Sequence, residues 1–110
     1  EGHQAVVGQK GRFQYSAEWL NYTKSVSKLP GVQVLLRVDE KSYDPVRPYF
    51  KTKGGKAMGD DHPVSWTRLY RGGRFFYTAI GHDKRSTNTK FGRQHIMNGI
   101  LFILRTAKIL

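Results

Sequence analysis

The sequence has 110 residues, which limits it to a single domain, and its 38% hydrophobic content is enough to bury a core, which excludes wholesale disorder. Nineteen Lys and Arg against eight Asp and Glu give a net charge of +11, so negatively charged partners have to be considered. The chain has no cysteine, which excludes disulfides, thiolate metal sites and a cysteine nucleophile, and no segment approaches the about 20 apolar residues that span a bilayer.

The first half of the chain contains two predicted strands. Phe13 and Tyr15 would share one face of a short strand. A clearer strand lies within "KLPGVQVLLRVDE" (28–40), after a Pro-Gly turn. Its apolar side chains alternate with a period of two, at Val32, Val34, Leu36 and Val38.

Residues 41–63 lack any periodicity and include the basic stretch "RPYFKTKGGKAMG" (47–59). Prolines and glycines punctuate this segment, which indicates a loop. A loop of this length in a compact domain calls for a functional explanation or for disorder. Polyanion or RNA binding through this basic loop is therefore one hypothesis for the chain.

The strongest pattern is a β-hairpin of residues 64–70 and 74–80, with "RGG" (71–73) as its turn. The second strand is apolar on both faces, which predicts a place inside a layered α/β sheet. A hairpin turn also explains "RGGR" (71–74) better than an RNA-binding segment does, so we do not expect nucleic acid as the main partner.

The period then becomes helical, with Thr87, Asn88 or Thr89 as the N-cap of a helix that runs from about 89 to 107. We expect its apolar stripe to pack on the sheet. The stripe consists of Ile96, Met97, Ile100, Leu101, Leu104 and Ala107.

Two groups of polar residues flank the hairpin, in "GDDHPVSW" (59–66) before it and in "GHD" (81–83) after it. Residues before the first strand of an antiparallel pair neighbour those after the second, so His62 and His82 are expected to lie close together with Asp61. An imidazole there can act as an acid, a base or a ligand. Asp60 and Asp61 could instead form a solvated turn, and His82 could simply bind backbone.

A histidine pair with carboxylates can bind a divalent metal, but no spacing such as HExxH supports this, so we predict no metal site. No motif points to a particular cofactor. His3 and His95 are isolated histidines to which we assign no role.

Four blocks of sequence resemble the ThuA-like, or trehalose-utilisation, family. They are "EWLN" (18–21), "VLLRVDEKSY" (34–43), "MGDDHPVSWTRLYRGGRFFYTAIGH" (58–82) and "FGRQHIMNGI" (91–100), in the same order as in the family. Any one block is weak evidence, but their combination is specific.

This resemblance implies an α/β fold, the C-terminal part of a flavodoxin-like, class I glutamine-amidotransferase-like sandwich with a β-hairpin and a closing amphipathic helix. Family domains are about twice this length, so residues 1–110 would form a partial domain whose N-terminal half is absent from this chain. That half, or a partner chain, is then expected as a partner.

The resemblance also implies work on a disaccharide or keto-sugar. His62, His82 and Asp61 are the expected catalytic groups, and Glu18, Trp19 and Asp60 the expected sugar-binding groups. Two departures from the family, Ala17 and Leu20 beside the Glu-Trp pair, together with the basic insertion at 45–57, favour the alternative of a non-catalytic scaffold or binding module.

Overall fold

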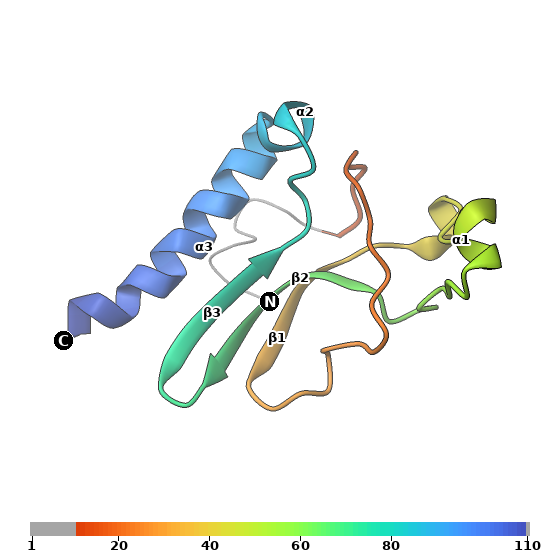
Figure 1. Ribbon diagram of the computed structural model, residues 1–110. Coiled ribbons are helices and arrows are strands. Elements are labelled where there is room, and N and C mark those ends of the chain that lie inside the picture. The colour runs from red at the N-terminus through yellow and green to blue at the C-terminus, as the bar shows by residue number, and fades with distance from the viewer. Residues whose placement is uncertain (1–10, 110) are drawn as a thin grey trace.

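The computed structural model describes the backbone of residues 11–109 and the side chains of residues 11–104. The elements in chain order are β1 (Val32–Arg37), the 3-10 turn η2 (Glu40–Ser42), α1 (Pro48–Thr52), β2 (Pro63–Tyr70), β3 (Gly73–Thr78), α2 (Lys84–Thr87) and α3 (Lys90–Ile109). The strands form one antiparallel sheet in the order β1-β2-β3, and α3 runs beside β3 (Figure 1). The fold is therefore mixed α/β.

The predicted hairpin is confirmed, because β2 and β3 pair antiparallel around the two-residue loop Arg71–Gly72. The φ angles of Arg71 and Gly72 are 51° and 77°, and two successive positive values are what a tight hairpin turn of this length requires. The pairing extends beyond β3 to a hydrogen bond of 2.8 Å from the Ala79 N–H to the Val64 carbonyl. This end of the hairpin carries the predicted site residues.

The strand predicted within residues 28–40 is confirmed as β1, which pairs with β2 and shifts its register between Val34 and Leu36 and again between Leu36 and Arg37. The strand predicted around Phe13 and Tyr15 is wrong, since neither residue belongs to a strand. Their rings instead pack edge-on against Phe91, with centroids 4.9 and 5.9 Å away. Alternation of side chains does not make a strand without a neighbouring backbone to pair with.

Helix α3 is confirmed as the long closing helix, and Thr89 is its N-cap because its Oγ1 accepts a hydrogen bond of 2.9 Å from the Gly92 N–H. The face that meets the sheet carries His95 and Gly99. His95 is fully buried there, with its Nε2 2.9 Å from Ser65 Oγ and 3.1 Å from Thr78 Oγ1. His95 thus has a packing role that its isolated position in the sequence did not indicate.

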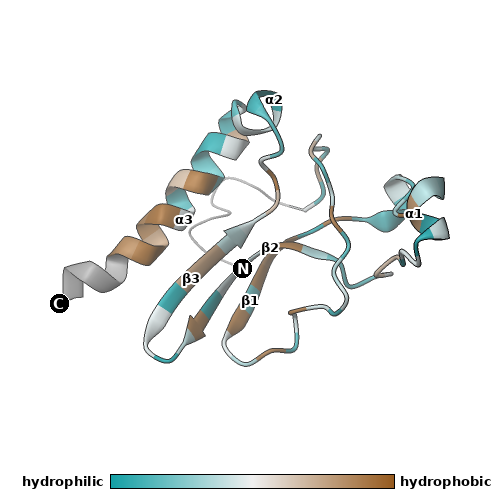
Figure 2. Cartoon of the chain, viewed as in Figure 1, coloured by the Kyte–Doolittle hydropathy of each residue, from teal (hydrophilic) through white to brown (hydrophobic). Residues whose placement is uncertain are grey.

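The prediction that the apolar stripe of α3 packs on the sheet is wrong. Its residues Met97, Ile100, Leu101 and Leu104 are 39 to 52% exposed, and Figure 2 shows the apolar turns along α3. The side chain of Ala107 lies outside the described residues. The helix presents Gly99 and His95 to the sheet because Gly99 leaves room for the Phe76 ring and His95 reaches the hydroxyls of Ser65 and Thr78. This orientation leaves the apolar side uncovered by the described chain.

The second hairpin strand is not buried on both faces as predicted, since Phe75 is 54% exposed. Tyr77, on the same face of β3 as Phe75, does lie in a packed cluster, stacked on Trp66 with ring centroids 4.2 Å apart. Tyr22 covers these two rings edge-on, so an irregular segment takes the place of a helix on this face. Residues 41–63, predicted to be a loop, also contain the short helix α1.

Candidate functional site

His62 is fully buried and belongs to an acid–imidazole pair. Its Nδ1 lies 2.8 Å from Glu40 Oε1, and its Nε2 lies 2.8 Å from the Leu20 carbonyl oxygen. Both ring nitrogens therefore face oxygen atoms at hydrogen-bond distance, and the tautomer of the ring sets which atom donates. The geometry places a carboxylate against an imidazole ring that is itself shielded from solvent.

Glu40 is the acid of this pair, and its side chain is only 9% exposed. The carboxylate also accepts hydrogen bonds from the Met58 N–H at 2.7 Å and the Gly59 N–H at 2.8 Å. Burial raises the pKa of Glu40, but the two backbone hydrogen bonds and His62 outweigh it and hold the pKa below its ordinary value. Glu40 thereby holds Met58 and Gly59, near the end of residues 41–63, beside the buried His62.

His82 belongs to a second, exposed acid–imidazole pair. Its Nδ1 lies 2.6 Å from Glu18 Oε2, and each of the two side chains is 53% exposed. An imidazole that is oriented by a carboxylate and open to solvent can exchange a proton with a ligand, which is the requirement for general acid–base chemistry. Of the two pairs, this one meets that requirement.

The two pairs are joined by the short segment Glu18–Leu20. Glu18 provides the acid of the exposed pair, and the Leu20 carbonyl accepts the hydrogen bond from the buried His62. Trp19, between them, is half-buried. Tyr22 continues the segment into the core, with its hydroxyl 2.5 Å from the Tyr77 hydroxyl. The buried pair therefore helps to hold the backbone that carries Glu18.

Asp61 and Asp60 point to different surroundings. Asp61 accepts hydrogen bonds from Ser27 Oγ at 2.5 Å and Arg37 Nε at 3.3 Å, and these partners, Ser27 first, lower its pKa. Asp60 is exposed and lines an open hollow of about 610 Å³. The hollow is lined by Arg12, Arg37, Val38, Asp39, Glu40, Lys41, Pro45, Gly59 and Asp60. The wall of the hollow therefore carries charges of both signs.

The residues expected to form one catalytic site, His62, His82 and Asp61, thus have separate partners in the structure. The hairpin leads His62 and His82 to the same end of the sheet, but each binds its own acid, and within residues 11–104 no hydrogen bond or ion pair joins them. No group of three metal-ligating side chains occurs among the described residues. In the same part of the chain, no helix is long and apolar enough to cross a membrane.

Glu40 is the residue that sequence reasoning missed. It is one of only eight carboxylates, and it lies in the block "VLLRVDEKSY" (34–43), which is the signal that could have found it. In the structure each pair joins two of the blocks singled out from the sequence. Glu18 meets His82, and Glu40 meets His62.

Comparison with known proteins agrees with these blocks. A family model described as "ThuA: Trehalose utilisation" matches residues 1–103, nearly the whole chain. No curated protein and no solved structure gives a significant match. On the strength of the family match, this chain belongs to the ThuA family, a family of trehalose utilisation.

Proposed function

We propose that this chain is a carbohydrate-utilisation domain that binds a disaccharide or keto-sugar at the exposed Glu18–His82 pair. The single observation that carries the proposal is this pair, 2.6 Å apart and half exposed, in a chain of the ThuA family. Sugar chemistry needs a positioned acid or base and polar groups that bind hydroxyls. His82 would be the acid–base group, and Glu18 would orient its ring and bind a hydroxyl.

The remaining predicted residues take supporting places in this proposal. Trp19 adjoins Glu18 and would stack on a sugar face. Asp60 would bind hydroxyls in the hollow, whose lining includes neither Glu18 nor His82. His62 and Asp61, expected to be catalytic, already have protein partners in the structure. We propose that they have a structural role in the site. His62 would hold the segment 18–22, and Asp61 would hold the start of β2.

Calorimetric titration with trehalose and with keto-disaccharides tests the proposal. Glu18→Gln and His82→Gln should each weaken binding about tenfold or more, because a hydrogen bond to a charged group contributes about 1.5–3 kcal/mol. Arg85→Gln is the matched control, since it removes a charge from the exposed Asp83–Arg85 pair and leaves Glu18 and His82 intact. Heat that is absent for every sugar, or equal losses in all three variants, contradicts the proposal.

A non-catalytic scaffold or binding module is the second candidate, and the exposed apolar side of α3 favours it. We propose that the N-terminal half of the same domain, or a partner chain, covers this side. The assembly would then be the flavodoxin-like, glutamine-amidotransferase-like sandwich of which this chain would be the C-terminal part. Sugar binding without turnover, in a protein that includes the covering part, would support the module over the enzyme.

A further inference from the structure

Helix α1 and the turn that follows it form an ordered element that stands apart from the sheet and from α3 (Figure 1). We call residues 47–56 the α1 projection. Its base is anchored at one end by Val46, which is 7% exposed, and is followed at the other by the Met58 and Gly59 amides that Glu40 binds. The turn is closed by a 2.8 Å hydrogen bond from the Gly55 N–H to the Phe50 carbonyl.

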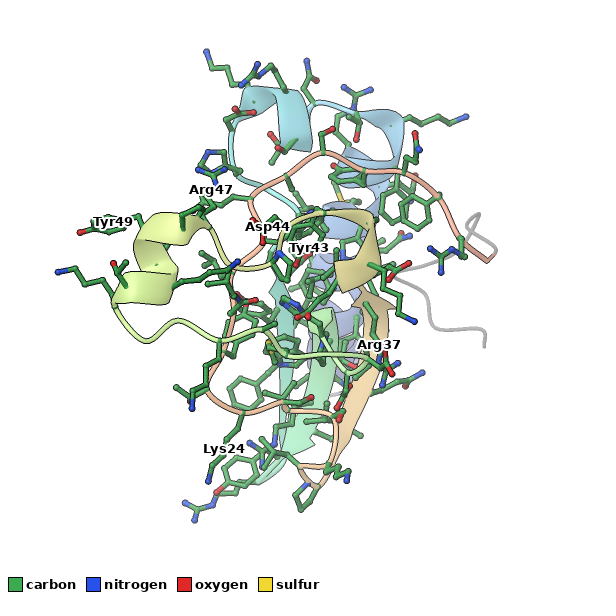
Figure 3. The ribbon with its side chains drawn as sticks, turned by 90° about the vertical axis from the view of Figure 1, so that its right-hand side faces the viewer. Lys24, Arg37, Tyr43, Asp44, Arg47 and Tyr49 are labelled. Carbon is green, nitrogen blue, oxygen red and sulfur yellow. The ribbon has the colours of Figure 1, made fainter. Side chains whose placement is uncertain are left out.

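Two aromatic side chains lie at the tip of the α1 projection. Tyr49 is 65% exposed and Phe50 is 55% exposed, with ring centroids 5.3 Å apart and ring planes at 81°. Figure 3 shows Tyr49 pointing away from the body of the molecule. Helix α1 contributes no buried residue, so the described chain does not use these rings as core. Adjacent exposed rings on an ordered element indicate a contact surface.

The charge of the α1 projection is entirely positive. No Asp or Glu occurs between Pro45 and Gly59, and the projection carries four basic residues, Arg47, Lys51, Lys53 and Lys56. All four are exposed, and none belongs to an ion pair in the described part of the chain. Lys53 Nζ lies 5.9 Å from the centre of the Tyr49 ring. The surface that complements this element is negatively charged and able to accept apolar rings.

We propose that the α1 projection binds an anionic lipid surface. Each Lys or Arg near the surface raises the affinity for anionic headgroups about fivefold. Aromatic rings are favoured at the boundary between headgroups and acyl chains, whatever the angle between the rings. Long basic side chains can lie along that boundary while their charges stay at the phosphates.

The ring geometry favours lipid over single-stranded nucleic acid. Successive bases stack on aromatic faces, and rings at 81° cannot both lie parallel to neighbouring bases of one stack. One side of the Tyr49 ring is also approached by the Lys53 ammonium. Nucleic acid is therefore the competing outcome for the experiment, and it would use the same charges without needing both rings.

Co-sedimentation with phosphatidylcholine vesicles, with and without phosphatidylserine, tests the proposal. The chain should bind only the phosphatidylserine vesicles, and binding should weaken as salt rises. The double variant Tyr49→Ser/Phe50→Ser should bind at least about tenfold more weakly, since burying one such ring already contributes about 1.5–3 kcal/mol. Lys51→Gln/Lys53→Gln should lose about 25-fold, at about fivefold for each charge.

The matched control is Lys84→Gln/Lys90→Gln, which removes two charges from an exposed surface elsewhere. It should keep most of the binding of the parent chain. Equal losses in both lysine variants would show only the general attraction of a basic protein, and would overturn the proposal. Failure of the chain to bind anionic vesicles would also overturn the proposal. A third overturning result would be that single-stranded DNA displaces the chain from the vesicles and that the Tyr49→Ser/Phe50→Ser variant binds this DNA as well as the parent chain does.

Discussion

Replacement of Glu40 should destabilise this protein far more than the same replacement of Glu18. Both residues are glutamates paired with a histidine, but the side chains of the Glu40–His62 pair are 9% and 0% exposed, and those of the Glu18–His82 pair are 53% exposed. Glu40→Gln and Glu18→Gln therefore make the same chemical change in two environments. The difference between them isolates the contribution of burial.

The expected magnitude follows from the three hydrogen bonds that the Glu40 carboxylate accepts, from Met58 N–H, Gly59 N–H and His62 Nδ1. A glutamine keeps one acceptor oxygen and places an amide N–H₂ against one of these donors. It also leaves the buried His62 ring without its carboxylate partner. Breaking a buried pair from one side costs about 3–5 kcal/mol, whereas an exposed pair contributes about 0–1 kcal/mol.

Urea unfolding followed by tryptophan fluorescence measures both variants, at neutral pH and in acid. Because the folded pKa of Glu40 lies below its ordinary value of 4.5, the contribution of Glu40 is complete above that pH and is lost as the pH falls through the folded pKa. The parent chain and Glu40→Gln should therefore approach each other in acid. Equal free energies of unfolding for Glu40→Gln and Glu18→Gln at neutral pH would refute the reasoning.

Two further predictions concern α3. Gly99→Ala should lower the free energy of unfolding by about 1–3 kcal/mol despite the better helix propensity of alanine, because the new Cβ would lie 2.2 Å from the Phe76 ring. The control is Met97→Ala, at an exposed position of the same helix. In the same urea titration it should change the free energy of unfolding by less than about 0.5 kcal/mol. The chain should also bind the apolar dye ANS through the exposed side of α3, and addition of the N-terminal half of a ThuA domain should reduce the dye fluorescence and raise the melting temperature. Dye fluorescence that stays unchanged, with no shift in melting, would argue against a covering partner.

Local sequence patterns determined the elements that depend on neighbouring residues. The alternation of residues 32–38 predicted β1, and the glycines after Tyr70 predicted the hairpin, because a two-residue turn needs positive φ angles. The helical period after Thr89 predicted α3, and the four quoted blocks identified the family. All of these signals lie within a few residues or in a fixed order along the chain.

Only the tertiary structure decided which side chains meet. Glu40 and His62 are separated by 22 residues, and Glu18 and His82 by 64, so no local spacing relates either acid to its imidazole. The orientation of α3 was also beyond the sequence pattern. Apolar periodicity predicts a helix with one apolar side, but the sheet receives Gly99 against the Phe76 ring and His95 against the hydroxyls of Ser65 and Thr78 instead. Long-range pairing and the fit of one surface to another determine such contacts, and neither is encoded in the periodicity of a single segment.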